Sequence, residues 1–226
     1  MPVFSLNKDI TFPHPELARE DGLLAVGGDL STERLLLAYK NGIFPWFNEE
    51  DPPLWWSPSE RAVMFLNEIK ISKSLKQELK KSDYAVRYNT NFNEVITNCQ
   101  KIRVNEEGTW ITSDIIKAYT TLHKLGLAHS VETYYKNELV GGLYGVVMGR
   151  VFCGESMFSL RSNASKIALV HLKKSLEKHQ FRLIDCQLMN PHLESLGARE
   201  IPRVDFLEIL GNSLEEKRLP NNWIND

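Results

Sequence analysis

The order of sequence patterns predicts an α+β fold containing a mixed sheet. Beyond the first sixty residues, three amphipathic helical patterns precede three strand patterns separated by turns, and a helix, a strand and a final helix follow. The chain has 226 residues, of which 42% are hydrophobic and 25% charged, so it can bury the core of one large domain or two small ones. No internal repeat or low-complexity tract points to a solenoid or a disordered tail.

The first sixty residues are dense in glycine, proline and tryptophan, unlike the rest of the chain. Three of the five tryptophans fall within eleven residues: Trp46, Trp55 and Trp56. Ser31 can cap a helix that stops at Asn41-Gly42 and leads into the segment GIFPWF. We therefore predict a small N-terminal domain at residues 1–60 and a larger domain at residues 61–226.

From Arg61 onward the hydrophobic periods become regular. The expected helices lie near Ser72 to Lys81, from Phe92 to Ile102, from Thr112 or Ser113 to Gly126, from Asn163 to His179, from His192 to Leu196 and from Val204 to Leu214. The expected strands are Ala128–Tyr135, Leu139–Val147 and Val151–Phe158, which form a meander, and the later Phe181–Gln187. Glycines inside the middle strand of the meander would weaken it unless something approaches its backbone closely.

The charge balance and the cysteine content argue against some classes of protein for this chain. With 27 basic and 29 acidic residues, the net charge of −2 argues against indiscriminate nucleic-acid binding, although a local basic patch remains open. The three widely spaced cysteines form no CxxC pair, which indicates reduced thiols in a cytosol. The N-terminal residues mix charges and prolines, and the uncharged run Val140–Gly149 is too short to span a membrane, so we expect a cytoplasmic protein.

Several motifs that would indicate other chemistries are missing from the sequence. It has no GxSxG elbow, so we expect no covalent enzyme intermediate. The six histidines have no metal-ligand spacing such as HExxH, and we predict no metal site. The glycine pairs match neither a phosphate-binding loop nor a dinucleotide fingerprint, so we predict no nucleotide cofactor.

An acid and an amide stand at the end of the strand Phe181–Gln187. The alternation of a strand puts Asp185 and Gln187 on one face and Cys186 on the other. An Asp that fixes the orientation of an amide would let the amide oxygen accept a hydrogen bond from a substrate amine. The alternative is a strand-end acid that satisfies a loop.

The segment GESMF offers a second group of candidate residues. The same alternation puts Glu155 and Met157 on one side of the strand. A carboxylate beside a methionine suits a cavity that binds an apolar side chain carrying an ammonium group. An edge-strand Glu in water above a core Met explains the segment equally well.

Four lysines have helical phasing, and their positions i, i+3, i+7 and i+8 would share one face: Lys73, Lys76, Lys80 and Lys81. Such a face can follow a phosphate backbone, but a solvated helix surface explains the lysines as well.

Several long segments together resemble the bacterial leucyl/phenylalanyl-tRNA–protein transferases. They are GLLAVGGDLSTERLLLAYKNGIFPWF, LWWSPSERAVMF, EEGTWIT, YGVVMGRVFCGESMF, NASKIAL and LIDCQLMNPHLESLGAREIPR. They occur in order from about Phe12 to Phe206, which is nearly the whole chain. The resemblance implies a small first domain joined to a larger domain similar to acyl-CoA N-acyltransferases.

The resemblance also implies an activity. Members of the family move Leu or Phe, and less well Met, from aminoacyl-tRNA to the α-amino group of proteins that begin with Arg or Lys, which marks those proteins for degradation by the N-end rule. The expected partners are therefore Leu-tRNA, Phe-tRNA and such acceptor proteins, with no cofactor, no membrane and a monomeric enzyme.

Family roles pass to matching positions of this sequence. The resemblance gives catalytic roles to Asp185, Gln187 and Glu155. It places around the aminoacyl-adenosine or in the side-chain pocket Tyr39, Trp46, Trp110, Tyr119, Phe152, Met157 and Ser159. The four lysines fall where the family keeps a tRNA-binding helix. An acyl-CoA-dependent N-acyltransferase and a non-catalytic tRNA-binding protein remain as alternatives.

Overall fold

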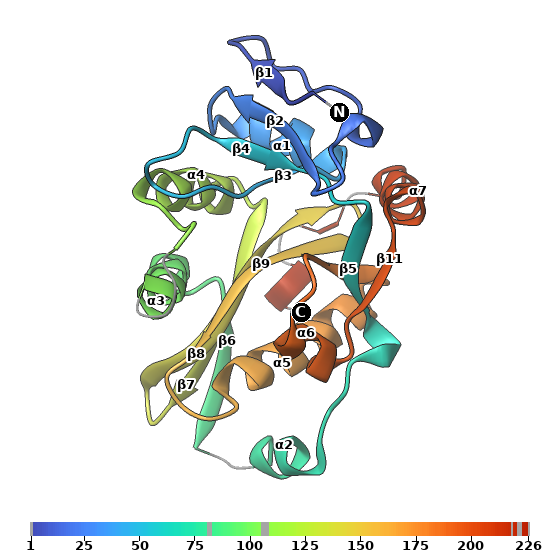
Figure 1. Ribbon diagram of the computed structural model, residues 1–226. Helices are drawn as coiled ribbons and strands as arrows, with labels where there is room; N and C mark the ends of the chain where they lie inside the picture. Colours follow the sequence, from blue (N-terminus) through green and yellow to red (C-terminus); the bar gives the residue numbers. More distant parts are fainter. Residues whose placement is uncertain (1, 81–82, 105–108, 218, 221–222, 226) are drawn as a thin grey trace.

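The computed structural model describes residues 2–80, 83–104, 109–217, 219–220 and 223–225. Within these ranges the chain forms a four-stranded sheet, in the order β1-β2-β4-β3, and a seven-stranded sheet, in the order β11-β5-β10-β9-β8-β7-β6. The smaller sheet lies at the top of the view in Figure 1, and the larger, twisted sheet lies below it.

The smaller sheet is made of β1 (Phe4–Leu6), β2 (Leu23–Gly27), β3 (Phe44–Pro45) and β4 (Leu54–Trp56). The larger sheet is made of β5 (Glu60–Phe65), β6 (Tyr84–Tyr88), β7 (Ala128–Tyr135), β8 (Glu138–Met148), β9 (Val151–Ser159), β10 (Leu183–Gln187) and β11 (Arg199–Pro202). The α-helices are α1 (Thr32–Lys40), α2 (Lys73–Glu78), α3 (Phe92–Val104), α4 (Ser113–Lys124), α5 (Ala164–Lys178), α6 (Pro191–Leu196) and α7 (Arg203–Leu214). Three short 3₁₀ helices are η1 (Pro15–Leu17), η2 (Leu66–Glu68) and η3 (Trp223–Asn225).

The two sheets share one hydrophobic core. Leu24 and Trp55 of the smaller sheet belong to the same buried cluster as Tyr119 of α4 and Phe158 of β9. Trp55 is fully buried, and its indole N–H donates to the carbonyl of Gly27 at 2.9 Å. The first sixty residues therefore do not pack independently of the rest. The change of sheet between β4 and β5 agrees with a boundary near residue 60, which stays a prediction.

Helices cover both faces of the larger sheet (Figure 1). Two neighbouring glycines of β8 show how closely the helices approach the sheet. A Cβ on Gly141 would lie 2.5 Å from the Cβ of Ala164 in α5, whereas one on Gly142 would lie 3.4 Å from Val95 in α3. Successive residues of a strand face opposite ways, so α5 and α3 lie on opposite faces. The expectation that something approaches the β8 backbone closely is thus confirmed.

Two β-bulges lie side by side in the larger sheet. In the β8–β9 pair, Glu155 is the extra residue, because Tyr144 pairs with Ser156 and Gly145 pairs with Gly154. In the β10–β5 pair, Cys186 is the extra residue. A bulge re-aims the side chains that follow it and ends regular pairing. The strands β9 and β10 are parallel neighbours, so the sheet is mixed and the two bulges lie close together.

The α+β class and the mixed sheet are confirmed. The sequence patterns missed β5, β6 and β11 of the larger sheet, of which β6 and β11 are its two edges, and all four strands of the smaller sheet. The helix expected near Ser72 to Lys81 is shorter than predicted and ends at Glu78. Of the two caps proposed for α4, the structure uses Thr112, whose hydroxyl accepts from the N–H of Ile115. No helix in the described ranges is both long and apolar enough to cross a membrane.

Candidate active site

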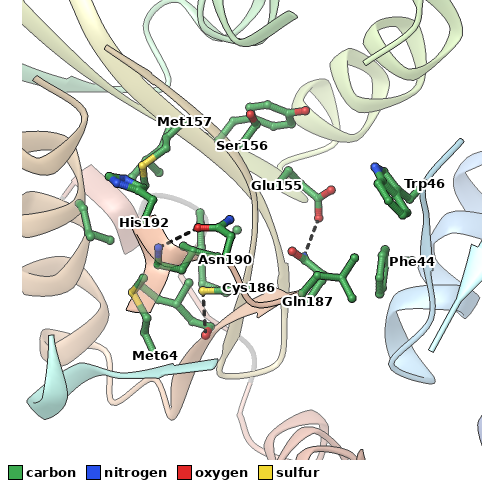
Figure 2. Close-up of a pocket in the computed structure, with 18 of the residues that line it drawn as sticks. Phe44, Trp46, Met64, Glu155, Ser156, Met157, Cys186, Gln187, Asn190 and His192 are labelled. Carbon is green, nitrogen blue, oxygen red and sulfur yellow. Dashed lines mark hydrogen bonds between the residues drawn. The ribbon is translucent and has the colours of Figure 1, made fainter. Parts of the chain in front are cut away.

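A cavity of about 280 Å³ lies where the N-terminal part meets the larger sheet. Its described lining comes from β3 and the residue after it, from β5, β8, β9 and β10, from α3, α5 and α6, and from Trp110 and the residues that follow β10. Figure 2 shows Glu155 and Gln187 in the middle of this cavity. The rings of Phe44 and Trp46 lie to one side of them, and Met157 lies to the other. The cavity thus has an aromatic end and an apolar end, with polar groups between them.

The apolar end forms a slot between the strands and the helices α5 and α6. It is lined by Met64, Leu143, Phe152, Met157, Leu169, Leu172, Ile184 and Leu193. Methionine fills irregular space and adapts to a ligand, and the leucines give the slot a shape. This end suits one aliphatic or aromatic side chain of a ligand.

Glu155 is the hub of a hydrogen-bond network at the cavity. The hydroxyl of Tyr39 donates to its Oε1 at 2.7 Å, and the hydroxyl of Tyr119 donates to its Oε2 at 3.2 Å. The two tyrosine hydroxyls also contact each other. Burial raises the pKa of both tyrosines, so each keeps the single proton of its hydroxyl and can donate one hydrogen bond.

The surroundings of Glu155 also set its own protonation state. Burial raises the pKa of Glu155 to about 8, and hydrogen bonds from Tyr39 and Tyr119 lower it only in part. Glu155 is therefore mostly a neutral carboxylic acid at pH 7. A neutral acid can donate a hydrogen bond, which a carboxylate cannot.

The amide of Gln187 bridges the gap between β9 and β10, which stop pairing at the two bulges. The carbonyl oxygens of Gly154 and Cys186 lie 3.0 Å from one end of this amide. The other end lies 3.5 Å from Glu155 Oε1. Only the NH₂ end can donate to carbonyls, so the amide nitrogen holds the two strands together and the amide oxygen faces the acid.

Asp185 lies behind the cavity and is fully buried. Its carboxylate accepts two hydrogen bonds from Arg61, at 2.7 and 2.8 Å. It also accepts from the backbone N–H of Gln187 at 3.0 Å. That bond fixes a backbone with φ of 59°, a left-handed conformation that only glycine adopts freely. Asp185 therefore orients the backbone of Gln187 and has no hydrogen bond to its side-chain amide.

Arg61 connects the opposite walls of the cavity. Besides Asp185 on β10, its guanidinium donates to the carbonyl of Gly42 at 3.0 Å. It also lies 4.8 Å from the ring centre of Phe44 and 4.6 Å from that of Phe206. Gly42 and Phe44 belong to the segment that carries Trp46. One buried side chain therefore joins the aromatic wall to the strand that carries Gln187.

Comparison with known proteins identifies the family. A family model described as "Leucyl/phenylalanyl-tRNA protein transferase" matches residues 63–211, and one for the "N-terminal domain" of the same family matches residues 28–59. The chain belongs to the leucyl/phenylalanyl-tRNA–protein transferase family. The larger family model alone covers more than half of the chain.

Individual relatives of the family agree over nearly full length. A leucyl/phenylalanyl-tRNA–protein transferase of Flavobacterium johnsoniae is 56% identical, with 92% of this chain and 99% of that protein covered. The relative from Syntrophobacter fumaroxidans is 52% identical, with 99% and 96% covered. Solved structures are far less similar: L-PGS from Bacillus licheniformis is 12% identical, with a TM-score of 0.42 over 74% of this chain and 54% of that one.

The structure brings most of the site residues suggested by the family together. Those that line the cavity are Glu155, Gln187, Trp46, Trp110, Phe152 and Met157. Trp46 is 42% exposed, and its ring packs edge-on against Trp56, 5.5 Å between centres. The indole of Trp56 in turn donates to the backbone carbonyl of Trp46 at 2.7 Å. Trp56 therefore fixes the position of the exposed Trp46 ring.

Four of those residues lie elsewhere. Asp185, Tyr39 and Tyr119 are buried behind the cavity wall and reach it only through Gln187 or Glu155. Ser159 is exposed at the end of β9, where its hydroxyl accepts from the N–H of Ser165 at the start of α5. The strand alternation was wrong for Gln187: Ile184 and Cys186 share a face as expected, but the bulge brings Gln187 into the same cavity lining and leaves Asp185 behind it.

The lysines expected to bind tRNA are exposed where the structure describes them. Lys73 and Lys76 lie on α2, and Lys80 follows its end. Lys81 lies outside the described residues. The shared helical face is therefore confirmed only for Lys73 and Lys76.

Several residues of the site escaped the sequence analysis. Arg61 was missed because its partner Asp185 is 124 residues away. Arg103 and Tyr144 also line the cavity, and His192 lines it from α6. Burial lowers the pKa of His192, which keeps this side chain neutral. In the described ranges, no group of three or more His, Cys, Asp and Glu residues could hold a metal ion.

Proposed function

We propose that this chain transfers Leu or Phe, and less well Met, from aminoacyl-tRNA to the α-amino group of proteins that begin with Arg or Lys. The transfer would mark these acceptors for degradation by the N-end rule. The observation that carries the proposal is the cavity itself: an apolar slot, an acid and an amide, and an exposed aromatic wall in one continuous space. Each part suits one part of an aminoacyl-adenosine.

The donor would bind with its side chain in the apolar slot and its adenine at the aromatic end. Stacking of a base on Trp46 or Trp110 contributes about 1–3 kcal/mol without reading the tRNA sequence. A methylene in an apolar pocket is worth about 1–3 kcal/mol, so a slot favours Leu and Phe over smaller residues. The shape of the slot, rather than its polarity, must exclude the β-branched Ile and Val.

The acceptor amine would attack the ester beside Gln187. An α-amino group has a pKa of about 7.7–8.0, so a large fraction is already neutral near pH 8 and a weak hydrogen-bond acceptor is sufficient. The Gln187 amide oxygen, which faces the cavity, would accept a hydrogen bond from the amine. The ester itself supplies the driving force, and the departing ribose hydroxyl takes up the proton, so the reaction requires no cofactor.

Glu155 would stabilise the tetrahedral intermediate. A neutral carboxylic acid donates a hydrogen bond to a developing oxyanion, whereas a carboxylate repels it. The two tyrosines behind Glu155 hold the acid in place. Asp185 and Arg61 act indirectly, because they set the backbone conformation of Gln187.

The proposal also names the partners, the location and the oligomeric state of the enzyme. Charged tRNA and an acceptor protein are the partners, with the exposed lysines near α2 as a contact for the tRNA backbone. We propose a cytoplasmic enzyme that acts as a monomer.

A transfer assay tests the activity directly. The enzyme is incubated with labelled Leu-tRNA and a peptide that begins with Arg, and the product is examined for a new N-terminal Leu by mass spectrometry. We expect transfer to the Arg peptide and none to an N-acetylated copy. Transfer from acetyl-CoA instead, or tRNA binding without transfer, would reject the proposal in favour of an acyl-CoA-dependent enzyme or a binding protein.

Substitution of Gln187 tests its assigned role. Gln187→Ala should lower kcat at least 10²-fold while the Kd for Leu-tRNA changes less than threefold, because the amide contacts the attacking amine and not the donor. The matched control is Asn212→Ala, an exposed position of α7. An equal loss in Kd and kcat would contradict the assignment.

A further inference from the structure

Arg103 is a cation in the cavity wall that the chemistry above does not use. It lies in the last turn of α3 and lines the cavity. Its Nε donates to the hydroxyl of Ser156 at 3.1 Å. Across the described ranges of the chain, Arg103 takes part in no ion pair, so most of the five N–H donors of its guanidinium remain available to a ligand.

A second donor without a partner lies close by. Tyr144 is paired across the strands with Ser156 and also lines the cavity. Its hydroxyl is buried and has no hydrogen-bond partner in the part of the chain that the structure describes. A buried polar group without a partner usually indicates a ligand, an ion or a water.

The charge of the cavity favours an anion. Among the described lining residues, the other ionisable side chains are Tyr144, Glu155, Cys186 and His192. Burial keeps all four neutral near pH 7, because it raises the pKa of Tyr144, Glu155 and Cys186 and lowers that of His192. The described lining therefore carries one net positive charge, on Arg103.

The position of Arg103 suggests which anion it meets. Trp110, seven residues further along the chain, lines the same cavity. A guanidinium that binds phosphate beside an indole that stacks on a base is a common way to hold a nucleotide. The apolar slot is left for the amino acid. In a charged tRNA, the terminal ribose carries the amino acid on one side and a 5′ phosphodiester on the other.

We propose that Arg103 binds the phosphate on the 5′ side of the terminal adenosine of the donor. This subsite rests on the proposed function, and it differs from the exposed lysines near α2, which lie outside the cavity. The enzyme would then contact the donor at two ends, at the amino-acid side chain in the apolar slot and at the first phosphate at Arg103. The enzyme would then prefer an aminoacyl nucleotide over an aminoacyl nucleoside.

Two stable donor analogues test the subsite: 3′-amino-3′-deoxyadenosine acylated with Leu through an amide, with and without a 5′-phosphate. Calorimetric titration of the unaltered enzyme should give at least tenfold tighter binding of the phosphorylated analogue. Arg103→Gln should reduce that ratio to below threefold and leave the affinity for the unphosphorylated analogue unchanged. The slope of log Kd against log salt should fall by about 1 for the phosphorylated analogue.

The matched control is Lys101→Gln, which removes the same charge from an exposed position of the same helix, outside the cavity. It should keep the tenfold ratio. Equal affinities of the unaltered enzyme for the two analogues would overturn the proposal whether or not any variant folds. Loss of both affinities in Arg103→Gln would mean that Arg103 contacts the ester or the adenosine instead.

The binding experiment and the transfer assay together distinguish a failure of the phosphate subsite from a failure of the proposed activity. If the unaltered enzyme transfers Leu from tRNA but does not distinguish the two analogues, the subsite is wrong and the function stands. If it transfers nothing while it prefers the phosphorylated analogue, the function is wrong and the anion site stands.

Discussion

Arg61 and Asp185 show how one buried pair can fix the position of the Gln187 side-chain amide without contacting it. Both are almost completely buried. Removing one partner of such a pair leaves an uncompensated charge, which typically costs about 3–5 kcal/mol. Replacing both partners with apolar residues costs far less.

We expect Arg61→Met to lower the free energy of unfolding by about 3–5 kcal/mol, measured by urea denaturation. The double variant Arg61→Met/Asp185→Leu should be more stable than Arg61→Met alone, because no charge stays buried. Additive losses would show that the packing of Arg61 against Phe44 and Phe206 matters more than its charge.

Glu155 should make stability depend on pH. Its pKa is raised by burial from 4.5 to about 8, so the folded state binds a proton that the unfolded state releases above pH 4.5. Stability is therefore lost as pH rises from about 4.5 to about 8. Glu155→Gln removes this loss. We expect its Tm, relative to the unaltered protein, to be higher at pH 8.5 than at pH 5.

The control for that measurement is Glu50→Gln, at an exposed position before β4. Its Tm difference should be the same at both pH values. A Tm difference for Glu155→Gln that does not change between pH 5 and pH 8.5 would mean that Glu155 is ionised in the folded protein.

Glu155 also affects the pH profile of transfer. The rate should rise as the acceptor amine loses its proton and fall above pH 8 as Glu155 ionises, which gives a bell-shaped curve of kcat. Glu155→Gln should keep the rising limb and lose the falling one. A falling limb that persists in Glu155→Gln would assign it to another group.

At the scale of the elements, the glycines of β8 allow residues of neighbouring elements to approach its backbone closely. A Cβ on Gly145 would lie 2.3 Å from the carbonyl oxygen of Cys153 and 2.5 Å from the ring of Phe152, which lines the cavity. Gly145→Ala should therefore destabilise the protein by about 1–3 kcal/mol and weaken donor binding by displacing Phe152.

The matched glycine is Gly211 in α7, where an added Cβ would meet nothing within 4 Å. Gly211→Ala should stabilise the protein by up to about 1 kcal/mol, since alanine is the better helix former. Thermal unfolding and donor titration of the two variants measure both effects. Equal effects of the two substitutions would contradict this account of β8.

Regular elements were predictable from sequence because their periods are local. The helices and the meander follow from apolar spacing, and the caps Ser31 and Thr112 follow from residue type. The edge strands β6 and β11 were missed because five and four residues carry too little alternation, and β5 was missed because its four buried residues are consecutive. The bulges at Glu155 and Cys186 leave no mark in the sequence, and they decide which side chains face the cavity. The pairing of Arg61 with Asp185 is set by the packing of distant strands, which no local pattern encodes.

At the scale of the whole molecule, the shared core should make the two sheets unfold together. Trp55, in the smaller sheet, packs in the same cluster as residues of β8, β9 and α4. We expect the urea transitions followed by tryptophan fluorescence and by far-ultraviolet circular dichroism to coincide. An earlier fluorescence transition would indicate that the N-terminal part unfolds first.

The slot for the ligand side chain takes much of its wall from α5 and α6, whereas Glu155 and Gln187 are held by strands. The helical wall can therefore be reshaped without moving the groups that stand at the bulges. Truncating a single leucine such as Leu172 or Leu193 is a route to transferases that accept larger, non-natural amino acids and label protein termini with them.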